Sequence, residues 1–253
     1  MVAAWVALTD LLVAAGEAVA HSASVAAFDR HVTATVVAHR TDTLTISMKV
    51  VTWFGTWVTL LVCLALLAVL CLRRRMPVLV VGIALVAWGG EAAGVAIGKA
   101  VVGRTRPPEQ IWMTVAHGSS WPSGHTAVAG VLFGSLAVAT SLIVRPLSVR
   151  VLTWASAALM VVAVAYSRIE LGVHWFSDTL GSMVFVTGWL TVVVLVLRQV
   201  WPASPSARHE QSAGSAGSGT TPTRATSGAV VTAPPWTGCG PGPWWKERCA
   251  PGR

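Results

Sequence analysis

Residues 76–98 read MPVLVVGIALVAWGGEAAGVAIG, an apolar run whose single charged side chain is Glu91. Its length matches the about 20 residues that a helix needs to cross the hydrocarbon core of a bilayer. Because the backbone finds no water there, such a run has to be helical. The run therefore predicts a transmembrane helix. Glu91, as an intramembrane carboxylate, is a candidate functional residue to which the sequence gives no role.

Further apolar runs of similar character lie on both sides of it: Val50–Leu72, His125–Val144, Val151–Ser167 and Thr179–Leu197. The N-terminal run Val2–Ala20 contains Asp10 and Glu17, and its end resembles a signal-peptidase site. It has no basic region before it, so we interpret it as a retained first helix rather than a cleaved signal. The runs together predict an all-α fold, a polytopic membrane helix bundle with six transmembrane helices.

The composition of the 253-residue chain supports this class, since 54% of its residues are hydrophobic and 11% are charged. A soluble domain carries about a quarter charged residues. The net charge of +8 could indicate a nucleic-acid surface, but Lys and Arg lie mostly between and beyond the apolar runs. We therefore expect membrane lipids and no nucleic acid as partners. No pair of the four cysteines has C-x-x-C spacing, so we expect no metal site and no cofactor.

The chain divides by composition near residue 200. Residues 1–200 form the expected membrane-embedded domain, within which Phe28–His39 is polar and mildly amphipathic and predicts a short helix on the membrane surface. Residues 201–253 are rich in Pro, Gly, Ser, Thr and Ala, a composition typical of a disordered tail. We expect that tail to be cytoplasmic.

The arginines between the runs predict the orientation. They occupy alternate connections, as the positive-inside rule requires of cytoplasmic loops: Arg73, Arg74, Arg75, Arg145, Arg150 and Arg198. The other connections then lie outside: His21–Lys49, Lys99–Gly124 and Arg168–Asp178. We therefore expect a multi-pass protein of the cell (plasma) membrane.

The outer connections carry three groups of polar residues at predicted helix ends. The groups are Lys99 with Arg106-Pro107, then Pro122-Ser123-Gly124-His125, then Ser167-Arg168 with His174 and Asp178. Each group alone has a plain structural explanation, such as interfacial anchoring, a helix start or an i, i+4 polar pair. Three cations, two histidines and a carboxylate on one face of a membrane together indicate an extracytoplasmic active site.

These residue types suit phosphoryl transfer, which depends on positioning and on stabilisation of negative charge. Lys99, Arg106 and Arg168 can bind phosphate oxygens, and backbone amides near Ser123 and Gly124 form an anion site at a helix N-terminus. Asp178 lies one turn after His174 and can fix its tautomer, leaving the other ring nitrogen free to attack phosphorus. His125 can then protonate the leaving oxygen.

The three groups resemble the three-part motif of type 2 phosphatidic acid phosphatases, with every motif position present between Lys99 and Asp178. The resemblance implies a metal-independent membrane phosphatase with a phosphohistidine intermediate on His174 and general acid catalysis by His125. It also implies phosphate contacts from five residues: Lys99, Arg106, Ser123, Gly124 and Arg168. The six-helix layout is similar to the bacterial branch that acts on undecaprenyl diphosphate.

The motif recognises phosphate rather than the lipid tail, so several substrates stay open. Undecaprenyl diphosphate is the expected one, with Arg104 as a candidate contact for the second phosphate. Phosphatidylglycerol phosphate and phosphatidic acid are the alternatives. A lipid-binding or transport protein without activity, and an oxidase like the vanadium haloperoxidases, are less consistent with a membrane chain that keeps both histidines.

Overall fold

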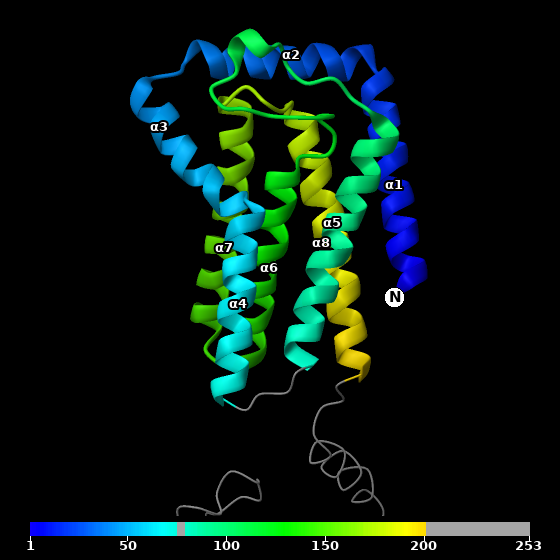
Figure 1. Ribbon diagram of the computed structural model, residues 1–253, viewed down its shortest axis with the longest axis vertical. Coiled ribbons are helices and arrows are strands. Elements are labelled where there is room, and N and C mark those ends of the chain that lie inside the picture. The colour runs from blue at the N-terminus through cyan, green and yellow to red at the C-terminus, as the bar shows by residue number, and fades with distance from the viewer. Residues whose placement is uncertain (75–78, 201–253) are drawn as a thin grey trace, which may run out of the picture. The chain divides into compact units, whose positions relative to one another are not determined.

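The computed structural model describes residues 1–74 and 79–200. The predicted tail 201–253 and Arg75 lie outside the described residues. The described chain is all helical, without a strand (Figure 1). Its elements are α1 (Val2–His21), α2 (Ala23–Ala38), α3 (Asp42–Val51), the 3₁₀ turn η1 (Thr52–Gly55), α4 (Trp57–Arg74), α5 (Leu79–Val102), the 3₁₀ turn η2 (Glu109–Ile111), α6 (Gly124–Ile143), α7 (Leu147–Glu170) and α8 (Phe176–Val200).

Within the described part, α1, α5, α6, α7 and α8 are each long and apolar enough to cross a membrane. The bent pair formed by α3 with η1 and by α4 makes a sixth span if it is counted as one. The predicted polytopic bundle is confirmed, and the helix bounds shift by only a few residues from the apolar runs. The predicted surface helix is also present, as the longer α2, which crosses one end of the bundle (Figure 1).

The run Val50–Leu72 is not one straight helix, which corrects the prediction. The chain bends by 48° between α3 and α4. At the bend Gly55 is buried against α6, where an added Cβ would lie 2.5 Å from the carbonyl oxygen of His125. Thr56 then turns to an extended conformation, and its hydroxyl accepts a hydrogen bond from the Thr59 amide at 3.3 Å. Close packing and a new helix cap therefore replace hydrogen bonds that a straight helix would make.

Packing of α5 against α1 and α8 brings the motif-bearing helix ends together. Small residues of α5 leave room for large aromatic rings, with Gly90 against Trp189 and Gly94 against Phe185 of α8. The Trp5 indole of α1 donates to the Gly90 carbonyl at 2.8 Å, so α1 packs directly against α5. Small residues at such contacts let membrane helices approach closely.

The motif-bearing helix ends and the basic connections lie at opposite ends of the bundle. The end of α5, the start of α6, the end of α7 and the start of α8 lie together beneath α2 and residues 103–123 (Figure 1). The described basic residues Arg73, Arg145, Arg150 and Arg198 belong to the opposite end. The three motif groups therefore share one end of the bundle, away from the arginines that predict the cytoplasmic side.

Labelling with a membrane-impermeant thiol reagent tests the orientation. Two exposed positions at opposite ends, Glu109 and Ser148, are replaced singly in a background whose native cysteines are serine. We expect Glu109→Cys to be labelled in intact cells and Ser148→Cys to be labelled only after the membrane is permeabilised. The reverse pattern would place the motif groups in the cytoplasm.

Candidate active site

The third motif is shaped by the way in which α7 ends. Gly172 adopts a left-handed conformation, with φ of +74°. The amides of Gly172 and Val173 donate back to the carbonyls of Ile169 and Arg168 at 2.9 and 3.2 Å, which is the Schellman arrangement. The chain therefore reverses within a few residues, and His174 returns beside the last turn of α7, where its own amide donates to the Arg168 carbonyl at 3.3 Å.

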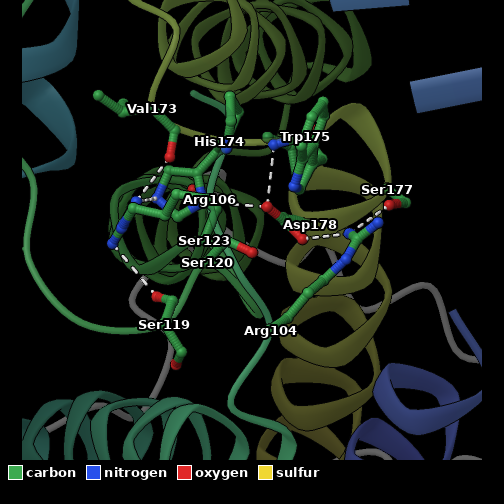
Figure 2. Close-up of polar contacts among 12 residues, drawn as sticks. Arg104, Arg106, Ser119, Ser120, Ser123, Val173, His174, Trp175, Ser177 and Asp178 are labelled. Carbon is green, nitrogen blue, oxygen red and sulfur yellow. Dashed lines mark hydrogen bonds and ion pairs between the residues drawn. The ribbon is translucent and has the colours of Figure 1, made fainter. Parts of the chain in front are cut away.

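His174 is held by groups on both ring nitrogens (Figure 2). Its Nδ1 lies 3.3 Å from Asp178 Oδ2, and Arg106 Nη1 lies 3.1 Å from its Nε2. Because arginine can only donate and an ionised carboxylate can only accept, this pairing corresponds to a proton on Nδ1 and a lone pair on Nε2. The expected Asp178–His174 pair is present, and the Nε2 lone pair of His174 is directed toward the Arg106 guanidinium.

Burial sets the protonation state of this histidine. The His174 side chain is 2% exposed. Burial lowers the pKa of His174 to about 4, while the hydrogen bond and negative charge of Asp178 act in the opposite direction. The neutral ring, which is the form that can attack phosphorus, therefore persists at every pH well above 4.

Arg106 links His174 to the outer loop. Its guanidinium donates to the carbonyls of Val173 at 2.6 Å, His117 at 2.9 Å and Gly118 at 2.9 Å. An open hollow of about 510 Å³ lies on the same loop, lined by Arg106, Glu109, Trp112, His117 and their neighbours. Arg106 thus both lines this hollow and contacts His174.

The other two predicted cations converge on the same place. Lys99, in the last turn of α5, donates to the Ser119 carbonyl at 2.8 Å, and Arg168 donates to the hydroxyl of Thr52 in η1 at 2.8 Å. Arg168 is 3% exposed, and its buried Nε has no hydrogen-bond partner in the described part of the chain. A buried guanidinium with an unsatisfied donor is suited to an anionic ligand.

The second motif forms the start of α6. His125 is half-buried there, and the charges of Arg168, His174, Arg106 and Lys99 all act on it. The Ser123 hydroxyl is fully buried and accepts from Thr126 at 3.1 Å. The Ser123 amide, however, donates to the Asp178 carbonyl at 3.2 Å. Gly124 and the residues after it, rather than the Ser123 amide, therefore supply the free N–H groups of the helix start.

Arg104 occupies a different place from the one expected. It is 8% exposed, and its guanidinium donates to Asp178 at 2.5 Å, to Asp29 at 2.7 Å and to Ser177 at 2.7 Å. Its donors are therefore directed into the protein, and the expectation that Arg104 meets a second phosphate is wrong. Sequence reasoning also missed Asp29 and Thr52, whose partners lie in distant segments of the chain.

Among residues 1–74 and 79–200, no three His, Cys, Asp or Glu side chains gather in a way that could hold a metal ion. The charges of Lys99, Arg106 and Arg168 instead all act on His125, and such a group of cations suits an anionic ligand.

Comparison with known proteins identifies the family and the fold. The model of the PAP2 superfamily matches residues 75–202. A solved PAP2-type phosphatidylglycerolphosphate phosphatase from Bacillus subtilis is 22% identical over 79% of this chain and 98% of its own, with a TM-score of 0.70. LpxE from Aquifex aeolicus is 20% identical over 65% of this chain and 93% of its own, with a TM-score of 0.51. No curated protein matches the sequence significantly.

The fold and the site thus define a multi-pass membrane phosphatase. The chain belongs to the PAP2 superfamily, and it is a lipid phosphate phosphatase.

The lowered pKa of His174 predicts the acid limb of the pH profile. If His174 attacks phosphorus, it must be unprotonated, and the enzyme loses activity only as the pH falls through the pKa of His174. We therefore expect kcat/KM to fall near pH 4 rather than near the ordinary histidine pKa of about 6.5. The measurement is kcat/KM between pH 3.5 and about 8 on one lipid phosphate, corrected for ionisation of its phosphate. A corrected limb that stays near 6.5 would contradict the assignment.

Proposed function

We propose that this phosphatase acts at the extracytoplasmic face of the cell membrane, where it hydrolyses undecaprenyl diphosphate through a phosphohistidine on His174. The observation that supports the chemistry best is the pairing of His174, with Asp178 on Nδ1 and Arg106 on Nε2. A phosphoryl group that accepts the Arg106 donor lies next to the lone pair of Nε2. The same cation then stabilises the phosphate oxygens during attack.

In the first step, Nε2 of His174 forms a bond to phosphorus and the bond from phosphorus to the lipid oxygen breaks. His125 gives a proton to that oxygen, which leaves with the lipid. The proton on Nδ1 remains on the ring, where the negative charge of Asp178 stabilises the positive charge that develops. Lys99, Arg106 and Arg168 bind the equatorial phosphate oxygens throughout.

In the second step, water attacks phosphorus and the bond from phosphorus to Nε2 breaks. His125, now neutral, takes the proton of the attacking water, and inorganic phosphate leaves. A phosphate dianion among the three cations places negative charge near His125, which favours the protonated ring needed for the next cycle.

Substrates whose leaving groups differ in acidity distinguish the proposed roles of the two histidines. His174→Ala removes the nucleophile, so we expect turnover to fall to background on every substrate. His125→Ala should reduce kcat by about 10²- to 10⁴-fold on a monoester, whose alkoxide needs a proton, and by less on a diphosphate, whose leaving group is more acidic. Acid-labile ³²P should accumulate only in forms that keep His174. Full turnover by His174→Ala would disprove the proposed nucleophile.

Two lipids are candidate substrates for this site. The end of the bundle that holds the site lies opposite the described basic clusters, so an outward orientation would expose it to undecaprenyl diphosphate left by cell-wall assembly. Phosphatidylglycerol phosphate is the second candidate, favoured by the fold shared with the Bacillus subtilis enzyme and by the burial of Arg104. Both present a terminal phosphate that the three cations can bind.

A direct comparison of specific activities decides between them. Undecaprenyl diphosphate, phosphatidylglycerol phosphate and phosphatidic acid are assayed in the same detergent, with and without EDTA. We expect kcat/KM to be at least about tenfold higher for undecaprenyl diphosphate, and EDTA to have no effect, because the proposed steps use only side chains. A preference for either glycerophospholipid would replace the proposed substrate and leave the histidine roles standing.

A further inference from the structure

Asp178 uses its two carboxylate oxygens for different partners. Oδ2 faces His174 at 3.3 Å and accepts the Trp175 amide at 2.9 Å, while Oδ1 accepts Arg104 Nη1 at 2.5 Å (Figure 2). The carboxylate is 0% exposed. Because both oxygens are engaged, the carboxylate can neither rotate nor reach water without breaking an ion pair. Its orientation toward His174 is therefore set by Arg104 as well as by the helix that carries it.

Arg104 is in turn held by the surface helix α2. Asp29 of α2 is 1% exposed and accepts Arg104 Nη2 at 2.7 Å. The other contacts of Asp29 are with Ser177, whose amide and hydroxyl donate to it at 3.0 and 2.5 Å. Ser177 also accepts Arg104 Nη1 at 2.7 Å. Asp29, Arg104 and Asp178 thus form one buried network that joins α2 to the start of α8.

Stability alone does not account for this network. Burying three charged groups costs desolvation free energy that their mutual attraction often fails to offset, and apolar side chains of similar volume serve packing as well. The network has the negative charge of Asp178 at one end, beside the proposed nucleophile. Its geometry instead provides what general base and nucleophilic catalysis need, which is an oriented carboxylate behind a histidine.

We propose that Arg104 and Asp29 are positioning residues of the phosphatase, which hold Asp178 so that His174 keeps its proton on Nδ1 and its lone pair on Nε2. The inference rests on the proposed role of His174 as nucleophile. Arg104 keeps Asp178 in the acceptor state, and Asp29 balances the Arg104 charge and ties it to Ser177. α2 is then part of the catalytic apparatus.

The charges of this network predict opposite effects on the pH profile. Arg104 disfavours proton uptake by the Asp178–His174 pair, and Asp29 favours it. The other charged groups acting on the pair are Arg106, Arg168 and Lys99, with His125 close by. Arg104→Gln should therefore move the acid limb to higher pH, because it removes a positive charge near the pair. Asp29→Asn should move it to lower pH, because it removes a negative charge.

Turnover kinetics give the first test. We expect Arg104→Gln to lower kcat by roughly 10- to 100-fold with KM within about threefold, since Arg104 does not touch the phosphate. Arg104→Lys should recover part of that loss. Exposed neighbours provide matched controls, Arg30→Gln for the arginine and Asp42→Asn for the aspartate, and both should behave as wild type. A rise in KM at unchanged kcat would show that Arg104 binds substrate and would overturn the proposal.

A readout independent of turnover separates this proposal from the proposed function. In ¹⁵N-histidine spectra of the detergent-solubilised protein, the His174 signals, identified by their loss in His174→Asn, should report the Nδ1–H tautomer. The tautomer should change or become mixed in Arg104→Gln. An unchanged tautomer together with unmoved acid limbs in both variants would make the network purely structural. If Arg104→Gln does not fold, Arg104→Lys and Asp29→Asn decide by the same criteria.

Discussion

The structure at the active end of this bundle depends on the balance of charges among side chains that are buried away from water. Asp178, Arg104, Arg168 and His174 are all nearly or fully buried at the ends of apolar helices. An unpaired charge there costs several kcal/mol, so each group has to be matched by a partner or by a ligand. Asp178 and Asp29 are matched by Arg104 within the protein. Arg168 retains an unsatisfied buried donor, which an anionic ligand could satisfy.

The helices serve this balance by bringing the ends of α5, α6, α7 and α8 together at one end of the bundle. α5 contributes Lys99, α6 contributes His125, and α7 and α8 flank the turn that carries His174. Glycines of α5 let it lie close to the aromatic side chains of α8. The loop after α5 then places Arg104 inward and Arg106 toward His174, although only one residue separates them.

The sequence was sufficient for the bundle and for the residues of the three motifs, because apolar length and motif spacing are local signals. It was not sufficient for the pairing of Arg104 with Asp29, since 75 positions separate them and nothing local marks Asp29 as buried. The break before α4 was missed for a related reason. Val50–Leu72 is apolar throughout, and the close approach of Gly55 to His125 is visible only once α6 is in place. Long-range contacts of this kind decide geometry without changing hydropathy.

The bend between α3 and α4 lies beside the active end and also on the outside of the bundle. Trp53, Phe54 and Trp57 beside the bend are exposed on the outside of the bundle, while Thr52 of the same turn accepts the hydrogen bond from Arg168. Helices respond to the thickness of the surrounding hydrocarbon by changing tilt and kink. The position of Thr52, and with it the hydrogen bond to the Arg168 guanidinium, therefore depends on the 48° bend. One short turn thus carries both aromatic side chains exposed on the outside of the bundle and a hydrogen-bond partner of a buried motif residue.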